Sequence, residues 1–193
     1  MKVFFDTEFT GLHQGTKLIS IGLIDEEGHT FYAETCDFME GYRDIDDLVW
    51  AKENLIPKLR FYGKQGKGYN NSGSTNRHTT VFGEISVIRD SLESWLIGND
   101  DPVEIWSDCL AYDWVLFNQL FGHAFKIPNN VYYIPFDICT MFKILNIDPD
   151  INREEFAGML TSAEKHNSLW DAKVIKACYE KMAEMMDCTS STY

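Results

Sequence analysis

The sequence lacks any apolar run that approaches the ~20 residues needed for a membrane-spanning helix. Its first residues, MKVFFDTEFTGL, are interrupted too early by Asp6 and Glu8 to form a signal peptide. It also lacks a C-x-x-C pair, and its five cysteines are widely separated. An odd number of scattered cysteines argues against a disulfide framework or a structural zinc site. We therefore expect a soluble, cytoplasmic protein with reduced thiols and no membrane contact.

Basic residues are scarce, with 17 Lys and Arg against 30 Asp and Glu and a net charge of −13. Nucleic-acid-binding proteins usually carry a basic surface, so this charge argues against a nuclease. The shortage is uneven, because no acidic residue occurs between Asn54 and Gly83. The same segment holds Lys58, Arg60, Lys64, Lys67 and Arg77, interleaved with Tyr62 and Tyr69. It can guide a nucleic-acid strand or be a solvated loop, and the charge pattern leaves both interpretations open.

The order of apolar segments predicts an α/β fold. Residues 2–5, 17–24 and 29–33 have strand-like composition, and the turn at 25–28 makes the last two a hairpin. Further strands are expected at 103–106 and 131–134, and helices at 47–59, 81–97, 111–121, 137–145 and 166–186. The segments 60–80 and 146–165 are expected to be irregular. We expect one domain over residues 1–187, with a central mixed five-stranded sheet flanked by helices, and a flexible tail at 188–193.

Asp6 and Glu8 stand two residues apart at the end of the first strand. Residues at this spacing point to the same face of a strand. Two carboxylates on one face repel each other unless a cation lies between them. The pair therefore indicates either a metal site or two acids that face water beyond the end of the strand.

Two further segments carry potential ligands and a potential base. Asp113 follows the expected strand 103–106 and lies in the first part of a helix, where an acid is also favoured by the helix dipole. His166 stands at the start of the last helix, with Asp171 on its first turn. Each of these residues, taken alone, has an ordinary structural explanation. The order in which the three segments occur is more informative than any one of them.

DTEFTGL at the start of the chain, Tyr112-Asp113 in its middle and His166-x4-Asp171 near its end resemble the three exonuclease motifs of the DEDDh exonucleases. This family belongs to the ribonuclease H-like superfamily. The resemblance spans the chain from Asp6 to Asp171, and the size is similar to that of compact stand-alone bacterial and phage exoribonucleases. It implies a ribonuclease H-like fold and 3′→5′ exonuclease activity.

The resemblance also implies a two-metal mechanism with Mg²⁺ or Mn²⁺, which prefer hard oxygen ligands. Asp6 would bridge both ions, Glu8 and Asp171 would complete the first site, and Asp113 would hold the second. Two such ions stabilise both the attacking and the leaving oxygen of an in-line displacement. His166 would be the general base, since an imidazole can accept a proton at neutral pH.

Several residues around these motifs are expected to contact the terminal nucleotide: Thr7, Phe9, Thr10, Gly11, Leu12 and Trp114. Gly11 permits a close turn, and the apolar side chains offer surfaces for a base. Phe9 and Trp114 can equally well be core residues. The family often has Asn five residues before the second-motif Asp, where this chain has Asp108. This departure leaves Asp108 as an alternative ligand, although the preceding Tyr112 favours Asp113.

The expected function is removal of nucleoside 5′-monophosphates from the 3′ end of RNA. The alternatives are a 3′→5′ DNA exonuclease and a non-catalytic nucleic-acid-binding member of the fold. The complete set of four carboxylates and one histidine argues against the non-catalytic alternative. The resemblance also allows a homodimer, for which the sequence contains no test.

Overall fold

A seven-stranded mixed sheet forms the centre of the computed structural model, which describes residues 1–63, 71–74, 77–98, 102–159 and 164–190. Its strand order is β4-β5-β3-β2-β1-β6-β7. The strands are β1 (Lys2–Phe9), β2 (Leu18–Asp25), β3 (Thr30–Thr35), β4 (Asn71–Ser74), β5 (His78–Gly83), β6 (Glu104–Ser107) and β7 (Phe136–Asp137). Strands β1, β2 and β3 are antiparallel neighbours, whereas β1–β6, β6–β7 and β3–β5 are parallel pairs. The α/β class and the antiparallel start are confirmed, but the expected count of five strands is wrong.

The additional strands arise from pairing that the local sequence does not reveal. Strand β4 has the sequence NSGS, which has no strand propensity, and it becomes a strand by pairing antiparallel with β5. Strand β5 occupies residues expected to form a loop and a helix start, so the helix begins at Ile85 instead of residue 81. The strand expected at 131–134 is also wrong. Val131 forms an isolated bridge with Val103, and β7 follows at Phe136.

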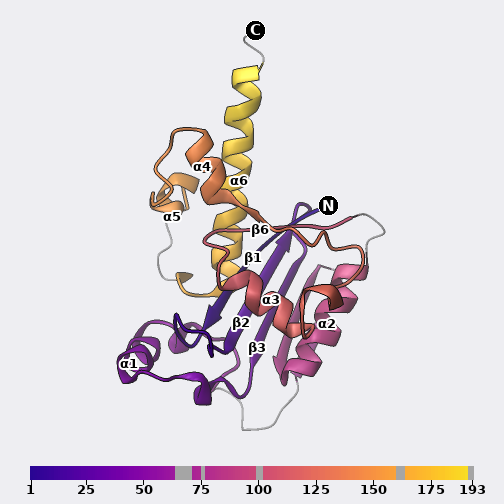
Figure 1. Cartoon of the computed structure of the whole chain (residues 1–193), viewed down its shortest axis with the longest axis vertical. Coiled ribbons are helices and arrows are strands. Elements are labelled where there is room, and N and C mark those ends of the chain that lie inside the picture. Colours follow the sequence, from indigo (N-terminus) through magenta and orange to yellow (C-terminus); the bar gives the residue numbers. More distant parts are fainter. Residues whose placement is uncertain (64–70, 75–76, 99–101, 160–163, 191–193) are drawn as a thin grey trace.

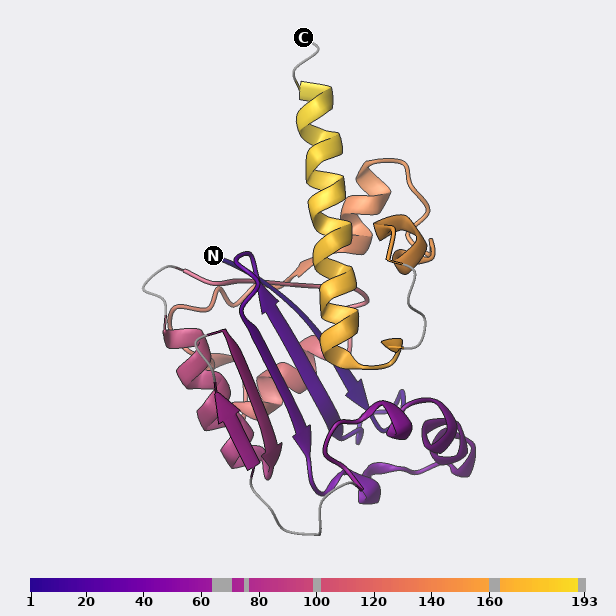
Figure 2. The ribbon, with the colours of Figure 1, turned by 180° about the vertical axis from the view of Figure 1, so that it is seen from behind.

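Helices cover both faces of the sheet (Figures 1 and 2). The helices are α1 (Ile45–Asn54), α2 (Ile85–Ile97), α3 (Asp113–Leu120), α4 (Ile138–Ile144), α5 (Arg153–Ala157) and α6 (Ser168–Ser190), with short 3-10 turns η1 (Phe38–Gly41), η2 (Ile56–Lys58) and η3 (Ala124–Lys126). Helices α2 and α3 lie on one face, and α6 crosses the other with α4 and α5 beside it. Helix α1 lies at the end of the sheet where β1 finishes.

Helix α6 extends past its expected end near Met186 to Ser190. The expected tail boundary at residue 188 therefore falls within the helix, and residues 191–193 lie outside the described part of the chain. Among the described residues, no helix is both long and apolar enough to span a bilayer. All five cysteines are free in the structure.

The alternation of side chains along β1 decides which face receives the acidic residues. Val3 and Phe5 are fully buried in the core beneath α2 and α3. Phe4 points the other way, into a second core formed with α4 and α6. Asp6 and Glu8 continue the Phe4 face because side chains on a strand repeat every two residues. The strand therefore presents its two carboxylates toward α6.

Candidate active site

Asp6, Glu8 and Asp171 converge on one point between β1 and α6. Each contributes a carboxylate oxygen to a group whose members all lie within 4.8 Å of one another. The β1–β2 register shifts between Glu8 and Phe9, which indicates a bulge at the end of the strand. Such irregularities often re-aim a side chain beside an active site. Two acids that stand close together in the sequence are thus joined by a third acid from far along the chain.

Helix α6 packs closely against β2, and this brings its first turn near β1. The backbone of Leu169 lies directly over Gly22, where an added Cβ would be 2.3 Å from the Leu169 amide nitrogen. The Ser20 and Ser168 hydroxyls are 3.0 Å apart and join the same two elements. Both serines are fully buried. A small residue and a buried hydrogen bond therefore fix the first turn of α6, which carries Asp171.

His166 lies at the mouth of this helix in a left-handed backbone conformation, with φ of 67°. Its backbone N–H donates a 3.0 Å hydrogen bond to Oδ2 of Asp171. Its ring meets the edge of Trp50 on α1, with centroids 5.0 Å apart. Burial, followed by the positive charges of Lys165 and Lys58, lowers the pKa of His166 below its usual value. The imidazole is consequently neutral, and able to accept a proton, at neutral pH.

Asp113 is the first residue of α3 and lies behind the cluster. Its Oδ1 accepts hydrogen bonds from the backbone N–H of Thr7 at 3.0 Å and from the Thr7 hydroxyl at 2.5 Å. Thr7 lies between Asp6 and Glu8 in the chain, so this contact ties the second motif to the first. Asp113 lies outside the 4.8 Å group, yet its negative charge still acts on both Asp6 and Glu8.

Asp108, the alternative ligand, is instead engaged by a cation. Its carboxylate forms an ion pair with Arg153 at the start of α5. The same guanidinium donates to the Cys139 thiol at 3.2 Å and the Pro149 carbonyl at 3.3 Å. Arg153 has no local signal because the segment 146–165 lacks a periodic pattern, and the expectation of irregular structure throughout that segment is wrong at α5. The ion pair leaves Asp113 as the better candidate for the fourth acid.

Burial and mutual repulsion disfavour the charged forms of these acids, and a bound cation would relieve that cost. Burial is the largest cause that raises the pKa of Glu8 to about 8, of Asp171 to about 7 and of Asp113 to about 6. The pKa of Asp6 is raised well above its usual range by burial and by repulsion from Asp171 and Asp113. Hard carboxylate oxygens that repel one another are a suitable donor set for Mg²⁺ or Mn²⁺. The residues present therefore fit a divalent metal centre.

Comparison with known proteins identifies the family of this chain. Residues 1–183 match the model of a family described as the Rv2179c-like 3′-5′ exoribonuclease domain. Two Mycobacterium tuberculosis proteins, the 3′-5′ exoribonucleases Rv2179c (strain H37Rv) and MT2234.1 (strain CDC 1551), are each 30% identical over 133 residues. Each match covers 68% of this chain and 67% of the relative.

The chain belongs to the Rv2179c-like 3′-5′ exoribonuclease domain family. This membership confirms the resemblance inferred from the three motifs. The fold is also similar to the Neurospora crassa Pan2 catalytic unit, which contains a protease and a nuclease domain, at a TM-score of 0.50 and 16% identity. That alignment covers 98% of this chain but only 28% of the Pan2 chain, so it concerns the fold alone.

In this member of the Rv2179c-like family, the acids open into a cleft of about 490 Å³. The cleft is lined by Asp6, Glu8, Asp171 and His166 together with residues 150–154. A neighbouring groove of about 610 Å³ is lined by Phe9, Thr10, Gly11, Leu12, Tyr42 and Trp50 and shares Glu8 with the cleft. Glu8 therefore borders both hollows.

The residues expected to contact a nucleotide have different surroundings. Leu12 is 75% exposed at the groove and is free to meet a base. Phe9 stacks on Tyr112, with ring centroids 5.4 Å apart, and also packs against the core. Thr10 is fully buried, and its hydroxyl accepts the backbone N–H of Lys17. Trp114 stacks on Phe117 at 5.1 Å and packs against the core beneath α3.

Thr7 and Gly11 are the other two residues expected to contact the nucleotide. The Thr7 hydroxyl is engaged by Asp113, and Gly11 adopts a φ of 148°, which favours glycine. A Cβ on Gly11 would lie 2.7 Å from a carboxylate oxygen of Asp47, a flexible side chain that can move, so the positive φ is the stronger reason for glycine here. In the basic segment, Lys64, Lys67 and Tyr69 lie outside the described residues.

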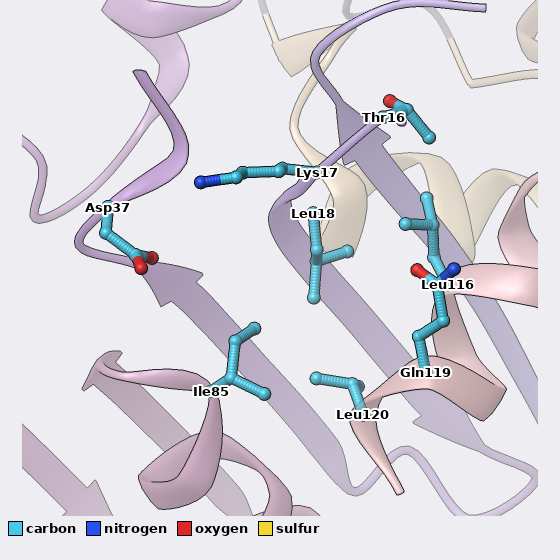
Figure 3. A pocket seen from close by; sticks show the side chains of 8 residues that line it. All are labelled: Thr16, Lys17, Leu18, Asp37, Ile85, Leu116, Gln119 and Leu120. Carbon is cyan, nitrogen blue, oxygen red and sulfur yellow. The ribbon is translucent and has the colours of Figure 1, made fainter. Parts of the chain in front are cut away.

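A smaller cavity of about 230 Å³ lies between the loop before β2, the start of α2 and helix α3 (Figure 3). Leu18, Ile85, Leu116 and Leu120 form its apolar wall, and Thr16, Lys17, Asp37 and Gln119 stand around it. It shares no residue with the acidic cleft. Its lining contains neither a carboxylate cluster nor a histidine, so it does not contribute to the chemistry described above.

Proposed function

We propose that this protein removes nucleoside 5′-monophosphates from the 3′ end of RNA by hydrolysis. The observation that carries the proposal is the convergence of carboxylate oxygens of Asp6, Glu8 and Asp171 within 4.8 Å of one another. The backbone N–H of His166 donates a hydrogen bond to Asp171 beside them. Family membership and the two relatives named as exoribonucleases support RNA as the substrate. DNA is the alternative substrate that the same chemistry allows.

Asp6, Glu8 and Asp171 would hold the divalent metal, and Asp113 would complete a second ion site. We propose two ions, Mg²⁺ or Mn²⁺. When bound, such ions supply charge stabilisation for the attacking and leaving oxygens of an in-line phosphoryl displacement. The donor set supports this assignment, because four repelling carboxylates at raised pKa are relieved by added positive charge.

His166 would act as the general base. A neutral imidazole nitrogen takes a proton from the attacking water, whose oxygen forms the new bond to phosphorus. The bond from phosphorus to the 3′ oxygen breaks, and the released 3′ oxygen takes up a proton from solvent. The ring is oriented by its edge contact with Trp50, and its backbone is held by Asp171. Lowering of the His166 pKa keeps the base unprotonated over the neutral range.

The proposal extends to the setting of the enzyme. The five free thiols support a location in the reducing cytoplasm. Apolar side chains exposed on α1, such as Ile45 and Val49, support association into a homodimer. Light scattering coupled to size-exclusion chromatography tests the dimer directly, since the monomer mass is 22.3 kDa.

The experiment is incubation with 5′-labelled single-stranded RNA and matched DNA, with Mg²⁺, Mn²⁺ or EDTA, resolved on a sequencing gel. We expect a metal-dependent ladder that shortens from the 3′ end and is faster on RNA. The Asp6→Asn variant, which keeps the side-chain shape, is expected to fold and to lack activity. Oligonucleotides that stay intact under every condition, from a folded sample, would favour the non-catalytic binding alternative. Faster cleavage of DNA than of RNA would identify DNA as the preferred substrate.

A further inference from the structure

The acidic cleft leaves a problem for a polyanionic substrate. Six acids line it: Asp6, Glu8, Asp108, Asp150, Glu154 and Asp171. Arg153 and Lys165 are the two lining cations, and Arg153 already pairs with Asp108. A metal centre offsets the acids at the bond that is cleaved, but the phosphates further along a strand require positive charge elsewhere.

Four cations lie beside the cleft on two separate segments, and we name them the basic strip: Lys58, Arg60, Lys165 and Lys173. Arg60 and Lys165 are exposed, and Lys58 and Lys173 are half-buried. The charges of Lys58 and Lys165 both reach His166, and the charge of Arg60 reaches Lys173. Glu164 is the acid whose charge also acts on Lys173. Cations whose charges act on one another and on the proposed base form an arrangement that an anion stabilises.

A buried carboxylate builds the first half of the strip. Glu34 is fully buried and accepts the backbone N–H groups of Arg60 at 2.5 Å, Phe61 at 3.1 Å and Tyr62 at 2.9 Å. It also accepts the Tyr32 hydroxyl at 2.6 Å. Burying a carboxylate is costly unless hydrogen bonds satisfy it, so these donors fix the turn at 60–62. The Arg60 guanidinium then lies 4.6 Å from the centre of the Tyr32 ring.

Asn167 joins this turn to the catalytic segment. Its side-chain amide donates to the Lys58 carbonyl at 3.3 Å and to the Tyr32 hydroxyl at 3.4 Å. Its side-chain oxygen accepts the backbone N–H of Trp170 and caps the first turn of α6. Asn167 is buried and directly follows His166 in the chain. The strip is therefore held in a fixed position relative to His166 and Asp171.

We propose that the basic strip binds backbone phosphates of the RNA strand on the 5′ side of the terminal nucleotide. The inference rests on the proposed function and deepens it by assigning a path to the rest of the substrate. Arginine and lysine are the side chains that bind phosphate oxygens, the first through a planar fork and the second as a point charge. Contacts with backbone phosphates carry no base information. The strip therefore favours longer RNA strands over shorter ones, whatever their sequence.

The test compares Arg60→Gln/Lys173→Gln with a matched control, Lys126→Gln/Lys143→Gln. The control lysines are exposed on η3 and α4, and neither lines the cleft. The backbone N–H at position 60 remains in the first variant, so Glu34 keeps its donors. Steady-state kinetics with Mg²⁺ on single-stranded RNA of two and of ten nucleotides gives the ratio of kcat/KM between the long and short substrates.

At low salt we expect this ratio to be roughly five- to tenfold lower in the strip variant than in the wild type, because the lost phosphate contacts serve only the long substrate. The slope of log(1/KM) against log[salt] for the decamer should become shallower by roughly 1.4, because each of the two lost contacts contributes about 0.7 on a single strand. The control variant should keep the wild-type ratio and slope. A strip variant with the wild-type ratio and slope would overturn the basic strip while leaving the exonuclease intact. A wild-type protein that shortens neither substrate would instead overturn the proposed function.

Discussion

Gly22 lies directly opposite Asp6 across β1 and β2, and the backbone of Leu169 lies directly over it. A Cβ at this position would be 2.3 Å from the Leu169 amide nitrogen and 2.4 Å from the Ser168 carbonyl carbon. Those atoms are backbone, and they cannot turn aside as a flexible side chain could. The absence of a side chain at Gly22 thus sets the distance between Asp171 and the two acids of β1.

The first prediction concerns Gly22→Ala. Its methyl group has to push the start of α6 away from β2, which should cost roughly 1–3 kcal/mol of unfolding free energy. Nuclease activity should fall further than stability does, because Asp171 moves with the helix. Urea denaturation and the gel assay measure the two effects.

The control for this prediction is Gly73→Ala on the edge strand β4. There a Cβ meets only the Thr80 hydroxyl, at 3.4 Å. Wild-type activity is expected in that variant. Equal stability and activity in the Gly22 and Gly73 variants would contradict the role given to the close approach.

The second prediction concerns pH and metal removal. The pKa values of Glu8 and Asp171 are raised to about 8 and about 7, above those of the same groups in the unfolded chain. The folded, metal-free protein therefore binds more protons than the unfolded chain, and its stability should fall as pH rises from about 5 to 8. Thermal unfolding in EDTA should show this decline, and added Mg²⁺ should raise Tm most at pH 8.

Asp6→Asn serves as the reference for the pH experiment. This variant removes one repelling charge from the cluster, so its stability in EDTA should depend less on pH. A wild-type Tm in EDTA that stays flat or rises between pH 5 and 8 would show that the pKa values of these carboxyl groups are not raised as described.

The third prediction separates Asp113 from Asp108. Asp113→Asn removes a charge that acts on Asp6 and Glu8, and activity should fall roughly a hundredfold or more if Asp113 holds a catalytic ion. Asp108→Asn removes the partner of Arg153 and should lower stability by more than it lowers kcat. Parallel measurements of kcat and of urea midpoints distinguish the two acids. The opposite ranking in kcat would assign the ligand to Asp108.

The fourth prediction concerns the acid limb of the pH–rate profile. A base must be unprotonated, and the pKa of His166 is lowered from 6.5 by burial and by Lys165 and Lys58. Activity should therefore be lost as pH falls, and the midpoint of this loss should lie below pH 6.5. His166→Asn should have low residual activity without this limb. A variant that kept the wild-type acid limb would place the titrating group elsewhere.

The proposed active-site chemistry was largely encoded in local sequence. The i, i+2 spacing of Asp6 and Glu8 places both on one face of β1, and this phase follows from strand geometry alone. The position of His166 before the last helix, with Asp171 on its first turn, was also predictable, and the helix does begin at Ser168. The antiparallel start of the sheet followed from apolar runs joined by a turn.

Other features depended on contacts between distant parts of the chain. Strand β4 has no local strand signal and exists because β5 pairs with it, and Arg153 reaches Asp108 from a segment without periodicity. The turn at 60–62 is fixed by Glu34, which lies 26 residues before Arg60. Sequence thus determined which side chains are the candidate acids and the proposed base, because side-chain direction within a strand or helix is a local property. Only the tertiary structure decided how far apart they lie and which cations surround them, since packing and charge neutralisation depend on partners across the fold.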